Sequence, residues 1–145
     1  MKKNKTIYVP MGADIIHTGH LNIIKKAKKY GEIVIGLFTD SAIAEYKTLP
    51  LINYSQRLEI MKNIKGISKI IKQDTWDYSN NLNKLKPNYV IHGDDWKKGI
   101  QQKTRLNVIK LLKRWKGRLI EVPYTKKVNI NENKKNLNNI FHNPE

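Results

Sequence analysis

The sequence predicts an α/β fold in which a parallel five-stranded sheet lies between two layers of helices. Segments rich in β-branched residues alternate along the chain with segments of helical periodicity. The runs IVIGLF (33–38) and YVIHG (89–93) are nearly continuous in apolar residues, as strands buried on both faces of a parallel sheet require. With 145 residues, the chain is long enough for one domain with a core of its own.

The predicted elements alternate between strand and helix from the first residues onward. Parallel strands of one sheet need crossover connections, which are right-handed and place helices on both faces. The clearest helix precedes Gly117, a typical stop residue, and has four apolar residues at i, i+3, i+4 and i+7: Val108, Leu111, Leu112 and Trp115. We predict strands at 6–10, 32–38, 69–72, 89–92 and 119–122, and helices at 21–29, 55–64 and 108–115.

One domain is predicted for residues 1–125, followed by a tail at 126–145. No internal repeat and no linker rich in Gly, Ser or Pro interrupts the domain. From about Thr125 onward the composition shifts to Lys and Asn with few large apolar residues, so we expect a lightly packed tail. Leu137, Ile140 and Phe141 would be enough to dock one short helix.

Composition excludes several classes of protein. The chain has no Cys, which rules out a disulfide scaffold, a zinc finger, an iron–sulfur protein and thiol catalysis. No apolar run approaches the roughly 18 residues that span a bilayer, and the start MKKNKTIYV enters a strand without an apolar leader. We therefore expect a cytoplasmic protein without a membrane partner.

The net charge of +16 suits small anionic substrates better than nucleic acid. Only four of the 28 basic residues are Arg, the residue that dominates base reading and bidentate phosphate binding. The Lys residues are spread from Lys2 to Lys135 instead of forming a patch. A positive surface raises the local concentration of small anions. A basic nucleic-acid-binding module stays the third alternative, testable by the salt dependence of binding.

The chemistry is predicted to lie in the loop after the first strand, because ligands of open parallel sheets bind beyond the carboxyl ends of the strands. Residues 11–20 of this loop read MGADIIHTGH and lead into a helix, whose N-terminus presents unpaired N–H groups to an anion. Gly12 and Gly19 keep side chains out of the path of a phosphate. His17 and His20 can each donate an N–H to it.

The two histidines suit phosphoryl transfer. A nearby polyphosphate would raise the pKa of His17 and His20 and favour their doubly protonated form. The pair would then neutralise charge that grows on a transferring phosphoryl group and its leaving pyrophosphate. Two alternatives are that the histidines only cap the helix, or that they bind a metal. The metal site lacks a third ligand in sequence register.

Four stretches carry a resemblance to a known family: IYVPMGADIIHTGHLNIIKKAKKYGEIVIGLFTD, LPLINYSQRLEIMKNIKGISKII, KPNYVIHGDDW and RLIEVPYT. Over residues 5–125 the chain resembles the cytidylyltransferase branch of the HxGH nucleotidyltransferase superfamily, which has a Rossmann-like fold. Within this branch, the chain looks most like the phosphonate cytidylyltransferases associated with phosphoenolpyruvate mutase. The segments that carry this likeness are AEYKTLP, YSQRLEIMKNIKG, LKPNYVIHGDDWKKGIQ and EVPYT. Choline-phosphate and glycerol-3-phosphate cytidylyltransferases are more distant relatives.

The resemblance implies a role for individual residues. His17 and His20 would stabilise the transition state at the α-phosphate of CTP, and Lys47 would reach over that phosphate and the acceptor oxygen. Mg²⁺ would be bound through the triphosphate, with no metal site made by protein ligands alone. The implied nucleotide-binding residues are Gly12, Ala13, Asp14, Gly19, Arg57, Gly93, Asp94 and Thr125.

An acceptor pocket is implied next to the nucleotide. Relatives that bind choline place an aromatic residue at the position of Trp76, and a Trp face attracts an ammonium group. The implied acceptor-binding residues are Trp76, Asp94, Asp95 and Trp96. Alternatives are that Trp76 and Trp96 only pack against neighbouring segments, and that Lys47 and Arg57 are surface charges.

The sequence departs from the family's pattern after Tyr124. Relatives continue with Gly-Ile-Ser and a further hydroxyl residue, which open a last helix that grips the β- and γ-phosphates. Here residues 125–131 read TKKVNIN, so Lys127 replaces the Gly, and Ile130 and Asn131 replace the hydroxyl pair. Lys126 and Lys127 would supply compensating charge if the segment still binds the triphosphate.

The sequence thus predicts a CTP-dependent cytidylyltransferase that transfers CMP to a small phosphonate and releases pyrophosphate. The expected acceptor is 2-aminoethylphosphonate or a hydroxyalkylphosphonate, with phosphocholine or another phospho-alcohol as the alternative. A catalytically impaired nucleotide-binding relative is the alternative from another class, and the altered 126–131 segment supports it. By resemblance, we also expect a homodimer.

Overall fold

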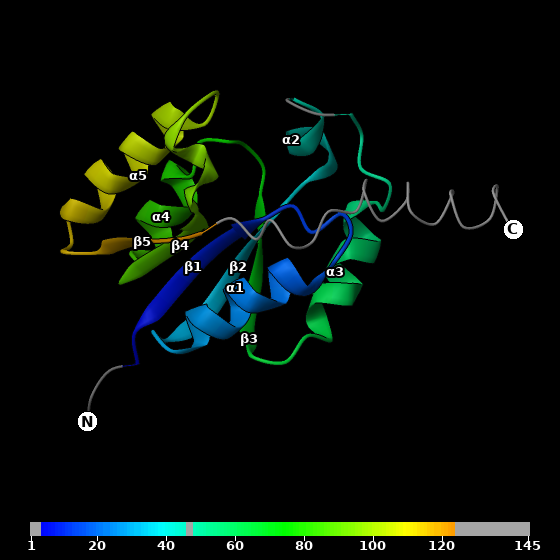
Figure 1. The fold of residues 1–145 in the computed structure, drawn as a ribbon, viewed down its shortest axis with the longest axis horizontal. Coiled ribbons are helices and arrows are strands. Elements are labelled where there is room, and N and C mark those ends of the chain that lie inside the picture. Colours follow the sequence, from blue (N-terminus) through cyan, green and yellow to red (C-terminus); the bar gives the residue numbers. More distant parts are fainter. Residues whose placement is uncertain (1–3, 46–47, 124–145) are drawn as a thin grey trace, which may run out of the picture.

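The computed structural model describes residues 4–45 and 48–123, and it shows the predicted fold class. Five parallel strands form one sheet in the order β3-β2-β1-β4-β5 (Figure 1). The strands are β1 (Thr6–Met11), β2 (Glu32–Phe38), β3 (Ile67–Gln73), β4 (Tyr89–Gly93) and β5 (Arg118–Val122). The helices are α1 (Thr18–Lys28), α2 (Asp40–Ala44), α3 (Tyr54–Lys62), α4 (Ser79–Leu85), the 3₁₀ helix η1 (Asp94–Lys97) and α5 (Gln102–Lys113).

Helices cover both faces of the sheet, as right-handed crossovers require. Side chains of β2 alternate between the two faces, with Ile35 in the core beneath α1 and α3 and Val34 in the core beneath α4 and α5. Burial of this strand on both sides explains its unbroken apolar sequence. The predicted three-layer arrangement is therefore confirmed.

The short helices α2, α4 and η1 were not predicted, and α5 is longer than predicted. Helix α2 has five residues and α4 has seven, and only Leu82 of α4 is buried. Such short segments show no apolar period from which a helix could be predicted. Helix α5 already begins at Gln102. The prediction missed its first turns because the first turn is polar and shows no apolar period. Lys47, Thr125 and the predicted tail at 126–145 lie outside the described residues.

The strand order positions the site. Strands β1 and β4 are neighbours but pair only through Ile7 with Tyr89 and Tyr8 with Val90, near their first residues. Their carboxyl ends are thus not joined by further pairs, and the chain leaves them in different directions. A crevice at this switch in strand order is where open α/β sheets bind their ligands.

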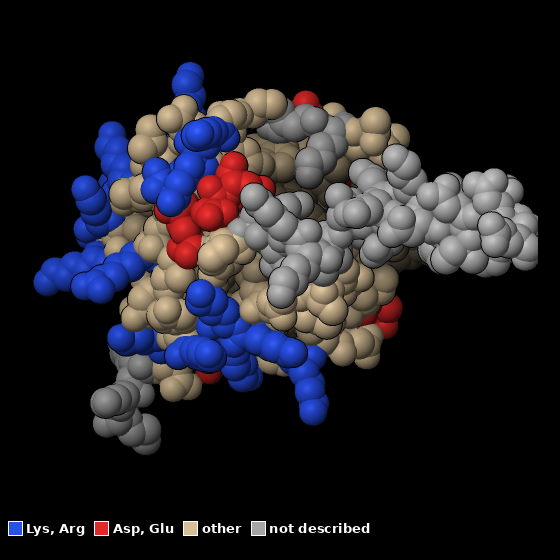
Figure 2. Space-filling model, in the orientation of Figure 1, with Lys and Arg blue, Asp and Glu red and all other residues tan. Residues whose placement is uncertain are grey.

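Basic residues are distributed over the surface. Figure 2 shows Lys and Arg at several places on one face of the molecule, with a small acidic group among them. None of the helices in the described part of the chain is long and apolar enough to cross a membrane.

Candidate active site

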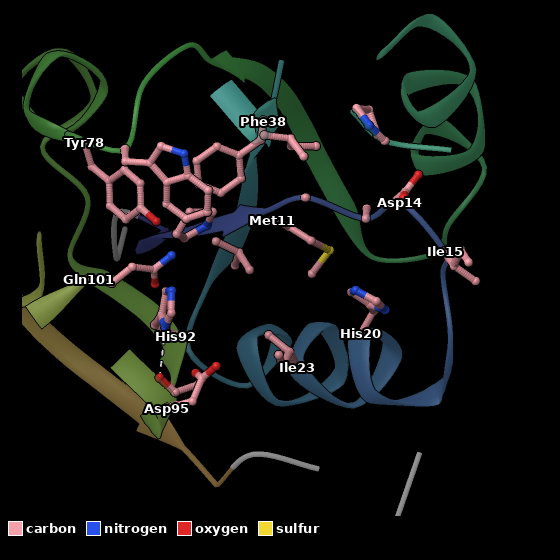
Figure 3. A pocket seen from close by; sticks show the side chains of 18 of the residues that line it. Met11, Asp14, Ile15, His20, Ile23, Phe38, Tyr78, His92, Asp95 and Gln101 are labelled. Atoms are coloured by element: carbon pink, nitrogen blue, oxygen red, sulfur yellow. Dashed lines mark hydrogen bonds between the residues drawn. The ribbon is translucent and has the colours of Figure 1, made fainter. Parts of the chain in front are cut away.

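A cavity of about 810 Å³ opens at the carboxyl ends of β1 and β4. This volume lies within the range of small-molecule sites. The loop after β1, the segment 48–51 and the ends of β2 and β4 all contribute to its wall (Figure 3). Among the residues predicted from the sequence, those that line it are Gly12, Ala13, Asp14, His20, Trp76, Gly93 and Asp95.

The two histidines are held by the backbone at the start of α1. His17 is the N-cap residue, and its Nδ1 accepts a hydrogen bond from the Gly19 N–H at 3.0 Å. The Nδ1 of His20 accepts one from the His17 N–H at 3.2 Å. Because each Nδ1 uses its lone pair as an acceptor, the neutral rings carry their proton on Nε2. The rings lie with their centroids 4.2 Å apart.

This geometry bears on the protonation state of His20. Burial, and the charge that His17 would carry, lower the pKa of His20 to about 4 from its ordinary value of 6.5. A second proton on either ring would also displace the backbone N–H from Nδ1. His20 therefore presents a neutral Nε2–H donor to the cavity. Double protonation of the histidines beside a bound polyphosphate stays a prediction.

The backbone around Gly12 lies close to the cavity. Ala13 adopts a left-handed conformation, with φ of 56°, and is almost fully buried. A Cβ added at Gly12 would meet no atom closer than 4.0 Å, so the space beside it is open. Gly19 is buried and does not line the cavity, and its N–H is already bound by His17.

Asp14 joins the loop after β1 to the segment that leads into α3. Its two carboxylate oxygens accept hydrogen bonds from the backbone N–H groups of Leu51, at 3.1 Å, and Ile52, at 2.9 Å. This arrangement fixes one wall of the cavity.

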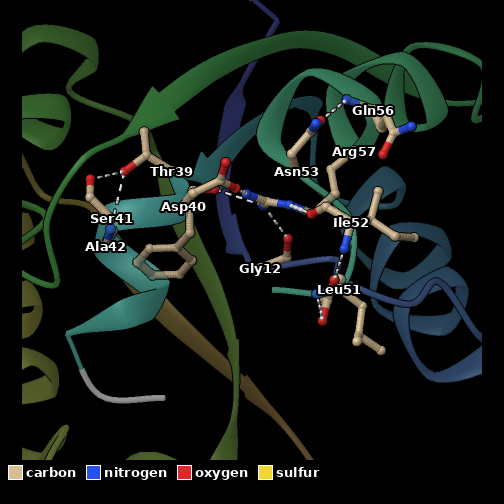
Figure 4. A network of polar contacts seen from close by, with 12 residues as sticks. Gly12, Thr39, Asp40, Ser41, Ala42, Leu51, Ile52, Asn53, Gln56 and Arg57 are labelled. Carbon is tan, nitrogen blue, oxygen red and sulfur yellow. Dashed lines mark hydrogen bonds and ion pairs between the residues drawn. The ribbon is translucent and has the colours of Figure 1, made fainter. Parts of the chain in front are cut away.

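Arg57 lies in a different place from the one predicted. Its side chain is fully buried and does not line the cavity. The guanidinium donates to the carbonyl oxygens of Gly12, Phe38 and Ile52 at 2.7–2.9 Å, and to the Asp40 carboxylate at 2.7 Å (Figure 4). Arg57 therefore holds three segments around the site together in this structure, instead of contacting a phosphate.

The end of β4 supplies part of the opposite wall. Gly93 and Asp95 line the cavity, and a Cβ at Gly93 would lie 2.9 Å from the Asp95 carboxylate. Asp94 is half-buried. Trp96, predicted at the acceptor, is instead 1% exposed and donates its Nε1–H to Glu121 at 2.9 Å. Trp96 is thus part of the core beneath the site.

Aromatic residues form the apolar end of the cavity. Trp76 lines it, stacks on Phe38 with ring centroids 4.5 Å apart, and donates its Nε1–H to the Ala42 carbonyl at 2.6 Å. The sequence predicted no site role for Tyr78, His92 or Gln101. All three line the cavity. The position of His92 at the end of a buried strand was the one signal that could have found it.

No group of three or more His, Asp or Glu side chains within residues 4–45 and 48–123 is arranged to hold a metal ion.

Comparisons with known proteins bear on this site. A family model described as cytidylyltransferase-like matches residues 13–140. The chain belongs to this family. The family predicted from the HTGH and GDDW motifs is thereby confirmed, and the narrower phosphonate branch stays a prediction.

The relatives include proteins of two kinds. An FAD synthase of Archaeoglobus fulgidus is 31% identical over 100 residues, which are 65% of this chain and 73% of the relative. An ethanolamine-phosphate cytidylyltransferase of Dictyostelium discoideum is 30% identical over 96 residues, which are 65% of this chain and 27% of the relative. Both relatives are nucleotidyltransferases.

A solved structure shows the same fold. The lipopolysaccharide core biosynthesis protein of Thermoplasma volcanium superposes with a TM-score of 0.73 at 19% identity, over 86% of this chain and all of that one. The likeness supports the parallel five-stranded nucleotidyltransferase fold.

Proposed function

We propose that this protein transfers CMP from CTP to a small phosphonate, 2-aminoethylphosphonate or a hydroxyalkylphosphonate, and releases pyrophosphate. One observation carries the proposal: backbone N–H groups occupy the Nδ1 atoms of both His17 and His20, which leaves two Nε2–H donors at the start of α1. Donors fixed before the ligand arrives stabilise charge that develops in the transition state without reorganising.

The reaction follows from this arrangement. A phosphonate oxygen attacks the α-phosphorus in line with the bond to the bridging oxygen, and the electron pair of that bond leaves with pyrophosphate. His17 and His20 donate their Nε2–H groups to oxygens of the α-phosphate and of the leaving pyrophosphate. No proton has to move to or from either ring. Mg²⁺, if bound through the triphosphate, would supply further charge neutralisation.

Further residues position the nucleotide. Arg57 and Asp14 fix the loop after β1, and the space beside Gly12 is open. We propose that the triphosphate binds in that space. We propose that Lys47 and Thr125 complete the phosphate contacts. Gly93 and Asp94 are proposed to lie next to the nucleoside.

The family supports a second acceptor class. The ethanolamine-phosphate cytidylyltransferases among the relatives favour a phospho-alcohol, and the FAD synthases add a flavin phosphate as an acceptor to be tested. A nucleotide-binding relative without chemistry stays the alternative of another class, because the 126–131 segment departs from the family's pattern.

Pyrophosphate release tests the proposal. The wild-type protein would be assayed with Mg²⁺ and either CTP or ATP against 2-aminoethylphosphonate, 2-hydroxyethylphosphonate, ethanolamine phosphate, phosphocholine, glycerol 3-phosphate and flavin mononucleotide. His17→Ala serves as the blank.

Turnover that requires CTP and a phosphonate supports the proposal. Turnover with a phospho-alcohol or flavin alone moves the assignment to that acceptor. A rise in Tm with CTP and no turnover would leave only nucleotide binding. Sedimentation equilibrium would test the proposed homodimer.

A further inference from the structure

The hydroxyl of Tyr78 is an unpaired polar group in the wall of the cavity. Among the described residues, its oxygen is the only buried side-chain polar atom without a hydrogen-bond partner. The ring is fully buried at the N-cap of α4 and packs edge-on against Tyr8. Buried polar groups almost always have a partner, so an orphan beside a cavity indicates a ligand atom or water that binds there. Burial raises the pKa of Tyr78, so the hydroxyl keeps its proton.

His92 lines the same cavity and offers a second unpaired atom. Its Nδ1 lies 2.8 Å from the Gly93 carbonyl, and since a carbonyl only accepts, Nδ1 carries the proton. The Nε2 of the neutral ring is then a hydrogen-bond acceptor. Burial lowers the pKa of His92, which favours this neutral form.

The His92 ring cannot turn easily. It stacks on Trp96 with centroids 3.7 Å apart and an interplanar angle of 7°. Trp96 donates to Glu121, whose carboxylate is also bound by Arg105 at 2.8 and 3.1 Å. A chain of contacts through the core thus fixes the acceptor atom of His92 before a ligand arrives.

A negative charge completes this end of the cavity. Asp95 lines it and is exposed, whereas the nearby Glu121 is already paired with Arg105. Figure 3 shows Tyr78, Gln101, His92 and Asp95 along one side of the cavity, with His20 and Asp14 on the other. This side of the cavity therefore lies across from the predicted phosphate site.

We propose that the Tyr78 oxygen, His92 Nε2 and the Asp95 carboxylate bind a protonated primary amine, so that the acceptor is an aminoalkyl phosphonate or phosphate. This inference rests on the proposed function. A primary ammonium has three N–H donors for these three acceptors, whereas a quaternary ammonium has none and would leave the buried atoms unpaired. Sites built to hydrogen-bond a substrate group strongly reject analogues that lack it.

The test compares two acceptors that share one phosphate and linker, but ethanolamine phosphate ends in three N–H groups and phosphocholine in three N-methyl groups. The ratio of kcat/KM for ethanolamine phosphate to that for phosphocholine would be measured with CTP, with 2-aminoethylphosphonate alongside. We expect a wild-type ratio of about 100 or more, reduced about tenfold in Tyr78→Phe and in His92→Phe. The control is Tyr8→Phe, because the Tyr8 hydroxyl is bonded in the core to Gln73 and Asn81 and does not line the cavity. It should lower Tm without changing the ratio.

Each result of this test either supports or overturns the proposed amine site. Transfer with a ratio near one, or in favour of phosphocholine, would overturn it while the proposed transfer stands. A ratio that Tyr8→Phe changes as much as Tyr78→Phe would also overturn it. If no acceptor is turned over, the proposed function fails. The amine site is then tested by calorimetric titration of the protein with ethanolamine phosphate and with phosphocholine. Tighter binding of ethanolamine phosphate that Tyr78→Phe abolishes supports the amine site, and equal or undetectable binding of both refutes it.

Discussion

Replacing Arg57 by Lys should strongly destabilise the protein. The guanidinium makes four hydrogen bonds of 2.7–2.9 Å, three of them to backbone carbonyl oxygens, and its side chain is fully buried. The acceptors lie around the planar guanidinium, and the single ammonium group of Lys cannot reach all of them. One or two of the carbonyl oxygens therefore lose their partner. At about 1–3 kcal/mol for each unpaired buried group, we expect the free energy of unfolding to fall by about 3 kcal/mol.

Urea denaturation measures this loss. With a slope near 2 kcal/mol per molar urea, the midpoint should fall by about 1.5 M at an unchanged slope. Arg114→Lys is the matched control, because Arg114 is exposed at the end of α5 and should shift stability by less than about 0.5 kcal/mol. If Arg57→Lys shifts the midpoint no further than the control does, the guanidinium does not hold the three segments together, and this reasoning fails.

Three further predictions concern the site and the sheet. Since the pKa of His20 is about 4 in the folded protein and returns to its ordinary value of 6.5 on unfolding, the unfolded chain binds more protons between these values. The free energy of unfolding should therefore fall by about 2–3 kcal/mol as the pH drops from 6.5 to 4, and an equal fall in His20→Asn would contradict the assignment. Gly36→Ala should destabilise by about 1–3 kcal/mol in urea denaturation, because its Cβ would clash with the buried Tyr8 hydroxyl; a wild-type midpoint would argue against that clash. Trp76→Ala should raise KM for a cationic acceptor and leave KM for CTP nearly unchanged, whereas equal loss for both would indicate packing alone.

The strands were predictable because consecutive residues of the sequence already show the apolar, β-branched composition of a buried strand. Each of the five predicted strands overlaps an observed one, since runs of β-branched and apolar residues report burial directly. Helices α2 and α4 were missed because five and seven residues are too few to show a period. The start of α2 is set by the cap residue Thr39, whose hydroxyl accepts the Ala42 N–H, whereas α4 begins without a side-chain cap.

The candidate site was predictable only where its residues are neighbours in sequence. The loop that carries His17 and His20 could be placed at a helix start from its own residues. The function of Arg57 could not, because its partners at residues 12, 38, 40 and 52 come together only through the fold. The stack of His92 on Trp96 likewise depends on how η1 turns back on β4.

The central claim is that the loop after β1 transfers a nucleotidyl group with its two histidine donors. Phosphorus NMR of wild-type protein with CTP, Mg²⁺ and 2-aminoethylphosphonate tests it most directly, with His20→Ala in parallel. We predict a CMP–phosphonate anhydride and free pyrophosphate in equal amounts, formed about 10²–10³-fold more slowly by the variant. Equal rates for wild-type and variant protein, or CTP left intact by both with every acceptor of the panel, would contradict the account.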